Sequence, residues 1–186
     1  YFLRAWCYYN LVKWYGGVPI VTDVLEPIAS SVVPRSSTKA CIDFICDDLN
    51  TAETLLARFT GSGQWMSGEN YGRVTSGAAV ALLGRVRLLY ASPMFNRTND
   101  VTRWTQAYED IKRSIGVLTA AGYGLANESN PGINASGWAS MFSQVPNTEG
   151  IFVTLYNIIG RIILGSMVSV QIILWGVVEK LLLPCW

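Results

Sequence analysis

Residues 71–96 read YGRVTSGAAVALLGRVRLLYASPMFN and specify the beginning, the apolar face and the end of one helix. The hydroxyl of Thr75 is placed to cap the first turn, because Ser and Thr side chains accept hydrogen bonds from unpaired amides at helix starts. Pro93 stops the helix, since proline lacks an amide hydrogen and clashes with the preceding turn. Apolar side chains recur at helical spacing, and the small residues that permit close approach of a neighbouring helix are Gly77, Ala78, Ala81 and Gly84.

Three further segments carry the local signals of helices. Residues 1–15 end at Gly16-Gly17, residues 37–59 begin at Ser37 or Thr38, and residues 102–121 end at Gly122. The side chains expected to face inward are Trp6, Trp14, Ile42, Ile45, Cys46, Leu49, Ala52, Leu56, Phe59, Trp104, Ala107, Tyr108, Ile111, Ile115 and Leu118. The acidic side chains expected to face solvent on the second of these segments are Asp43, Asp47, Asp48 and Glu53.

The lengths and spacing of these helices predict the fold class. Long helices joined by short polar loops favour antiparallel neighbours, and their starts recur at about the 34-residue interval of helix–turn–helix repeats. The sequence therefore predicts an all-α domain of tetratricopeptide-like antiparallel helix pairs over residues 1–156, although the strict consensus of that repeat is absent. Residues 122–150 are expected to form a structured loop or a short helix on the surface, and residues 151–156 alternate weakly as a strand.

Composition excludes several classes of function. With 15% charged residues and a net charge of +1, the chain offers no basic surface for nucleic acid. The four cysteines lack CxxC spacing and no histidine is present, so neither a metal site nor a cofactor is expected, and Cys41 and Cys46 are assigned to the core. Without histidine or a Gly-x-Ser-x-Gly motif, the common nucleophile arrangements of hydrolases are missing, and the protein is not expected to be an enzyme.

Residues 157–186 differ in character from the rest of the chain. Between Ile158 and Val178 the sequence is almost entirely apolar and is long enough for a transmembrane helix. The alternative is an out-of-frame translation, which we favour because reading each codon two bases later turns every isoleucine into Asn, Asp, His or Tyr. The nucleotide sequence distinguishes the two interpretations.

Residues 1–156 resemble the SusD/RagB family. The motifs that carry the resemblance are Trp14-Tyr15-Gly16-Gly17-Val18-Pro19, Arg35-Ser36-Ser37-Thr38, Gly72-Arg73-Val74-Thr75-Ser76-Gly77-Ala78-Ala79 and Ala91-Ser92-Pro93-Met94-Phe95-Asn96. The resemblance implies a non-catalytic, mostly helical lipoprotein on the outer membrane surface of a Gram-negative bacterium. Such proteins capture glycans or other nutrients and deliver them to a SusC-like TonB-dependent transporter. It also implies that this sequence is an internal fragment, with the signal and the N-terminal lipid anchor lying upstream.

Two loops have the side chains that sugar binding needs, namely aromatic faces that pack on a pyranose ring and polar groups that bond its hydroxyls. The candidate glycan-binding residues are Trp65, Glu69, Asn70 and Tyr71 in the first loop, and Asn134 and Trp138 in the second. Two alternatives remain open. The same helix pairs suit a helical-repeat adaptor that binds other proteins, and a genuine apolar run at 158–178 would make the chain an integral membrane protein.

Overall fold

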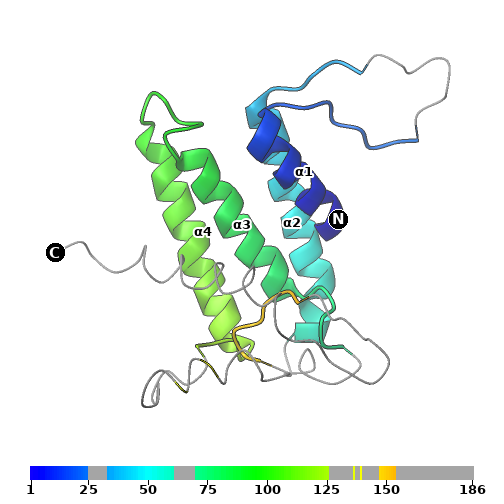
Figure 1. The fold of residues 1–186 in the computed structure, drawn as a ribbon, viewed down its shortest axis with the longest axis vertical. Coiled ribbons are helices and arrows are strands. Elements are labelled where there is room, and N and C mark those ends of the chain that lie inside the picture. Colours follow the sequence, from blue (N-terminus) through cyan, green and yellow to red (C-terminus); the bar gives the residue numbers. More distant parts are fainter. Residues whose placement is uncertain (25–32, 61–69, 126–135, 137–138, 140–146, 154–186) are drawn as a thin grey trace.

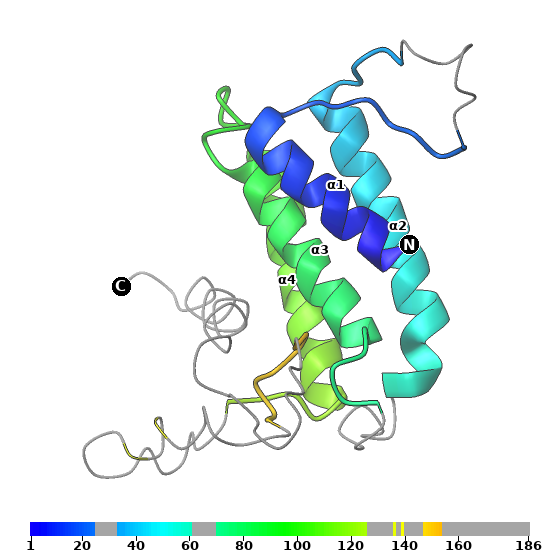
Figure 2. The same ribbon diagram turned by 45° about the vertical axis from the view of Figure 1, so that its right-hand side comes forward.

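The computed structural model describes residues 1–24, 33–60, 70–125, 136, 139 and 147–153. Within these ranges the chain forms four α-helices and no strand: α1 (Phe2–Tyr15), α2 (Thr38–Thr60), α3 (Ser76–Ala91) and α4 (Val101–Ala120). Figures 1 and 2 show α2, α3 and α4 side by side, with α1 packed against α2 and α3. Consecutive helices run in opposite directions (Figure 1), so the prediction of an all-α fold with antiparallel neighbours is confirmed.

Helix α3 lies at the centre of the bundle and contacts each of the other three helices. Its start is capped as the sequence predicts, because the Thr75 hydroxyl accepts a hydrogen bond from the Ala78 amide at 3.2 Å. It ends at Ala91, two residues before Pro93. Most side chains between these ends are buried on all sides, as expected for a helix with neighbours on several faces.

The small residues of α3 allow α4 and the segment after it to come close. A Cβ added at Gly84 would lie 3.1 Å from Cγ1 of Ile111, and one added at Gly77 would lie 2.7 Å from the ring of Tyr123. Ala81 is only 3% exposed. The close approach predicted from these small side chains is therefore confirmed.

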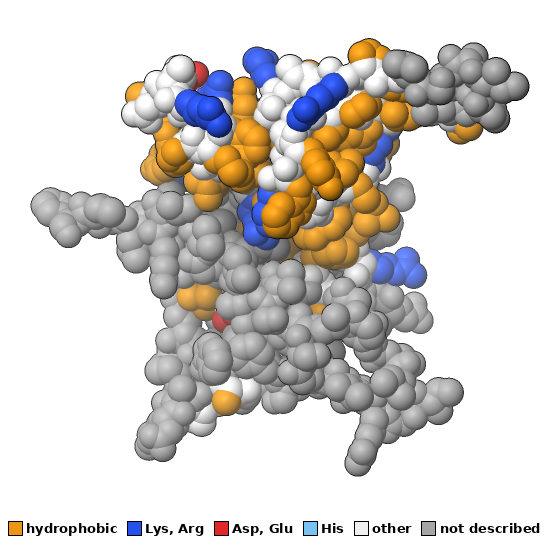
Figure 3. All heavy atoms as spheres, turned by 45° about the horizontal axis from the view of Figure 1, so that its top comes forward, with side chains coloured by type: hydrophobic (Ala, Val, Ile, Leu, Met, Phe, Trp, Pro, Cys, Tyr) orange, Lys and Arg blue, Asp and Glu red, His pale blue; other side chains and the backbone are white. Residues whose placement is uncertain are grey.

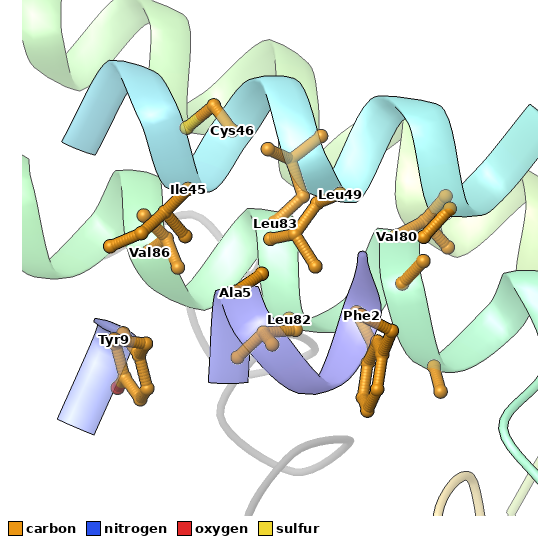
Figure 4. Close-up of a cluster of buried hydrophobic side chains, with 14 of the residues drawn as sticks. Phe2, Ala5, Tyr9, Ile45, Cys46, Leu49, Val80, Leu82, Leu83 and Val86 are labelled. Carbon is orange, nitrogen blue, oxygen red and sulfur yellow. The ribbon is translucent and has the colours of Figure 1, made fainter. Parts of the chain in front are cut away.

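The main core fills the space between α1, α2 and α3. Figure 4 shows Phe2, Ala5 and Tyr9 of α1 facing side chains of the other two helices, among which Ile45, Leu49, Leu82, Leu83 and Val86 are labelled. Cys41 and Cys46 are buried in this core, as predicted. Burial raises the pKa of the Cys46 thiol to about 12, which keeps the sulfur in its unreactive, protonated form at neutral pH.

Two glycines end α1 and attach it to the segment that precedes α2. Gly16 has a φ of 73°, a left-handed conformation that glycine adopts without steric cost. A Cβ at Gly17 would lie 2.1 Å from the carbonyl oxygen of Ser36. Any larger residue at this position would therefore clash with the backbone of the segment before α2. The Arg35 guanidinium donates hydrogen bonds to the carbonyl oxygens of Tyr15 and Gly17. Arg35 therefore satisfies carbonyls at the end of α1 that have no partner inside the helix.

Several side chains predicted to be buried are exposed. Trp14 is 75% exposed and Trp104 is 37% exposed, and Tyr108 also faces solvent. Trp104 and Tyr108 are exposed because α4 packs mainly on α3. That contact covers only a narrow stripe of α4, formed by Ala107, Ile111, Ser114 and Leu118.

Asp48 is wrongly predicted to face solvent, since it is only 4% exposed. Its two carboxylate oxygens each accept a hydrogen bond of 2.7 Å from the guanidinium of Arg4 on α1. The same guanidinium lies 4.9 Å from the ring centroid of Phe44. The bidentate ion pair joins α1 to α2 and satisfies the charge that burial would otherwise penalise.

The expected strand at residues 151–156 is not found in its described part, where residues 151–153 form a bend and a coil. Residues 154–156 and the whole apolar run at 158–178 lie outside the described residues. Among the helices that are described, none combines the length and apolar character required to cross a membrane.

Candidate functional site

Three stretches of chain meet at the end of the bundle where α3 begins. They are the turn at residues 70–75, the residues that follow α4, and the segment 147–153, which Figure 1 shows in orange, passing beneath the start of α3 at the level of the last turns of α4. The first of these stretches contains two of the predicted glycan-binding residues, Asn70 and Tyr71. We therefore take this end of the bundle as the candidate site.

Tyr71 joins two of these stretches. Its hydroxyl accepts a hydrogen bond from the amide of Asn147 at 3.3 Å, and its half-buried ring packs against the core. Burial raises the pKa of the Tyr71 phenol, an effect that the hydrogen bond from Asn147 partly opposes. A Cβ at Gly150 would lie 3.3 Å from the same hydroxyl. The phenol stays protonated at neutral pH and holds the 147–150 turn beside the start of α3.

A second tyrosine, which sequence reasoning does not single out, anchors the end of α4. The hydroxyl of Tyr123 lies 2.8 Å from the hydroxyl of Thr75, and its ring is 3% exposed. Burial raises the pKa of Tyr123 to about 12. The sequence does contain a signal for this contact, because an apolar residue just after a helix-ending glycine such as Gly122 often packs back on the helix.

The segment 147–153 is folded onto the bundle through polar and apolar contacts. The Asn147 side chain accepts a hydrogen bond from the Glu149 amide at 2.8 Å, and the Gly124 amide donates to the Thr148 carbonyl at 3.3 Å. Ile151 is buried, and the ring of Phe152 lies edge-on to Phe2 with centroids 5.4 Å apart. The predicted surface loop is thus fixed to the core at its end.

Asn147 and Glu149 are buried polar residues that the sequence-based site does not include. The available signal was the Asn-Thr-Glu-Gly sequence at 147–150, because Asn side chains commonly bond the backbone two residues on in a turn. Both residues are buried, so they support the 147–150 turn and do not face solvent.

The other predicted site residues lie outside the described part of the chain, namely Trp65, Glu69, Asn134 and Trp138. Asn70 and Tyr71 stand together at the turn before α3, where the Asn70 carbonyl accepts a hydrogen bond from the Arg73 amide at 3.0 Å. The stacking surface formed by Trp65 and Tyr71 remains a prediction.

A polar groove runs between α2 and α4. It has a volume of about 690 Å³ and is lined by Asn50, Glu53, Thr54, Ala57, Asp110 and Arg113. Arg113 donates to both carboxylate oxygens of Glu53, at 2.7 and 2.9 Å. The lining has hydrogen-bonding groups but no aromatic ring among the described residues, so it lacks a face on which a sugar would stack.

Comparison with known proteins points to one family. Residues 1–88 match the model of a SusD-like family described as starch-binding associating with outer membrane. A crystal structure of a SusD-like protein from Bacteroides fragilis NCTC 9343 is 32% identical over 85% of this chain, with a TM-score of 0.62. No curated protein matches the chain.

Two further structures share the fold at lower identity. A SusD-like carbohydrate-binding protein from the same strain is 22% identical over 84% of this chain, with a TM-score of 0.60. A structure with xylogluco-oligosaccharide is 22% identical over 86%, with a TM-score of 0.61. The chain spans only 26% to 29% of the length of these three proteins. The family match and the 32% identity together show that this chain belongs to the SusD-like family.

Proposed function

We propose that this chain forms part of a non-catalytic protein that captures glycans at the cell surface. The observation that carries the proposal is the SusD-like family match over residues 1–88, because that family is described as starch-binding. Carbohydrate binding by a structural relative and the xylogluco-oligosaccharide in another agree with it.

The described contacts around the start of α3 support a site at this end of the bundle. Sugar recognition requires side chains on loops that a rigid scaffold keeps in place. Tyr71 is fixed by the Asn147 amide, and Thr75 and Tyr123 hold the start of α3 against the end of α4. Trp65 and Glu69 precede this fixed point in the sequence, so we propose that they bind the sugar together with Asn70 and Tyr71.

The glycan would then pass to a transporter. We infer that the complete protein is attached by a lipid to the outer membrane and delivers its ligand to a SusC-like TonB-dependent transporter. The description of the family as associating with the outer membrane supports this location. Co-purification of the complete protein with a TonB-dependent β-barrel from solubilised outer membranes is the expected result, and its recovery without any such barrel would contradict the delivery step.

Calorimetric titration of the complete protein tests glycan capture. Xylogluco-oligosaccharide is the first probe because a protein of the same fold was solved with it, and starch oligosaccharides are the second. Trp65→Ala is expected to weaken binding by about tenfold or more while leaving the melting temperature nearly unchanged, because we propose that its ring stacks on the sugar and not in the core.

The matched control is Trp104→Ala on α4, a partly exposed tryptophan far from the 70–75 turn, which is expected to leave glycan affinity unchanged. Equal affinity of Trp65→Ala and the parent protein would contradict the role of Trp65. Release of shorter sugars during prolonged incubation, detected by chromatography, would contradict the absence of catalysis.

A further inference from the structure

A second pocket lies at the opposite end of the bundle from the candidate site. It is bounded by the first turn of α2, the last turn of α3 and the connection between α3 and α4, and it has a volume of about 450 Å³. The side chains that matter for its chemistry are Lys39, Tyr90, Met94, Phe95, Arg97 and Arg103. The pocket has room for about one or two sugar units. Its lining combines positively charged and apolar side chains.

The charge of the pocket is positive. Its lining contains Lys39, Arg97 and Arg103 but no carboxylate among the described residues. The first turn of α2 also contains no acidic residue, and the positive end of its helix dipole lies at this end of the bundle. Figure 3 turns this end toward the viewer and shows Lys and Arg side chains lying among hydrophobic ones.

Two nearby carboxylates reduce this charge without cancelling it. Asp43 lies 2.6 Å from Lys39, but both side chains are largely exposed, so water weakens the pair. Asp100 lies 3.6 Å from Arg103, while its Oδ1 is engaged by the amide and hydroxyl of Thr102 at the start of α4. Arg97 is exposed and has no hydrogen bond or ion pair within the part of the chain that the structure covers.

Arg103 is held in a fixed orientation. Its Nη1 donates to the carbonyl of Phe95 at 2.9 Å, and its guanidinium carbon lies 4.1 Å from the ring centroid of Tyr90. These contacts use only part of the five N–H groups of an arginine. The remaining donors are pre-oriented for a planar acceptor, and a carboxylate is the group that fits such a fork.

The apolar walls determine what kind of anion fits. Tyr90 and Phe95 are half-buried, and Met94 is exposed at the rim. An inorganic anion would gain nothing from Phe95 and Met94, whereas the ring of a sugar presents C–H groups that pack on such side chains. Tyr90 contributes by holding Arg103 over its ring. A carboxylate attached directly to a pyranose ring combines both requirements.

We propose that this pocket binds a hexuronate unit of an acidic oligosaccharide, with the carboxylate at Arg97 and Arg103 and the ring on the apolar wall. The proposal rests on the proposed glycan capture and assigns a charge preference to it. The pocket and the turn at residues 70–75 lie at opposite ends of α3, which is 16 residues or roughly 24 Å long. The two sites therefore respond to different substitutions.

Titration calorimetry of the complete protein with trigalacturonate and with the neutral trisaccharide of the same linkage tests the proposal. We expect tighter binding of trigalacturonate, with an affinity that falls as salt is raised because the contact is ionic and accessible to solvent. Arg97→Gln is expected to lower the trigalacturonate affinity about three- to tenfold, the effect of removing one exposed charge-assisted hydrogen bond. It should leave the affinity for the neutral sugar and the melting temperature unchanged.

Lys112→Gln is the matched control, since it removes one positive charge from the exposed face of α4 outside the pocket. Equal losses for Lys112→Gln and Arg97→Gln would overturn the pocket in favour of general charge attraction. In a competition experiment, galacturonate should displace trigalacturonate at a lower concentration than sulfate does. Equal displacement by the two anions would overturn the assignment of a sugar to the pocket. If neutral oligosaccharides bind but trigalacturonate shows no preference, the pocket fails and glycan capture stands. If trigalacturonate, xylogluco-oligosaccharide and starch oligosaccharides all fail to bind, both proposals fail.

Discussion

Asp48 joins two helices through a charge that is almost completely buried, and its replacement should be costly. Asp48→Ala leaves the Arg4 guanidinium without its bidentate partner, so we expect the free energy of unfolding to fall by roughly 1–3 kcal/mol. The value is below that of a fully buried pair because the Arg4 side chain is 35% exposed. Urea unfolding measures it, and Asp47→Ala, on the exposed side of the same helix turn, provides the control. Equal stability of the two variants would show that the ion pair contributes nothing.

The buried phenol of Tyr123 is expected to make the folded protein less stable at alkaline pH. Burial raises its pKa to about 12, above the value of 10.0 for an exposed tyrosine, so the folded protein holds this proton more tightly than the unfolded chain. The stability gained is complete below about pH 10 and is lost as the pH rises toward 12. In Tyr123→Phe the unfolding free energy should therefore decline less steeply above about pH 10. Tyr108→Phe, at an exposed position on α4, should follow the parent protein.

At the level of the helices, the contact of α3 with its neighbours leaves no room for a larger side chain. Ala81→Leu adds three carbons at a position that is 3% exposed, so we expect overpacking to lower the free energy of unfolding by roughly 1–3 kcal/mol. Thermal unfolding of Ala81→Leu and of Ala120→Leu, an exposed position on α4, makes the comparison. A neutral Ala81→Leu variant would show that the helices separate easily at this point.

The helices themselves were predictable because their signals are local. Thr75, Pro93 and Gly16 determine helix ends through their own hydrogen bonding and backbone preferences. Which face of each helix is buried was less predictable. Trp104 keeps helical core spacing, yet its exposure depends on whether another helix covers that side of α4, which the local sequence does not encode. Trp104→Ala should accordingly cost less than the roughly 3–5 kcal/mol of a buried tryptophan.

Of the predicted site residues, the structure describes only Asn70 and Tyr71, and their role in glycan binding stays a prediction. The spacing of aromatic and polar residues identified the turn before α3, but the contacts of Tyr71 with Asn147 and of Thr75 with Tyr123 join residues far apart in sequence. Such pairs follow from how α3 and α4 are placed against each other. Asp48 was mispredicted for the same reason, because its partner Arg4 lies on a different helix.

For the whole molecule, the apolar C-terminal region gives a prediction about solubility. The four described helices and the contacts of residues 147–153 all precede residue 157. Truncation after Tyr156 is therefore expected to improve solubility, since it removes a long apolar run, and to preserve the helical circular dichroism signal. A loss of helical signal on truncation would show that residues 157–186 belong to the fold.

The packing of Phe152 against Phe2 and Trp6 has a consequence for biosynthesis. A ribosome releases the first helix early, but the ring that completes its aromatic cluster emerges only after the rest of the bundle has been made. Until then Phe2 keeps one edge open, and a nascent chain stalled before residue 152 would present that edge to chaperones. The aromatic cluster of α1 is therefore complete only once residue 152 has been synthesised.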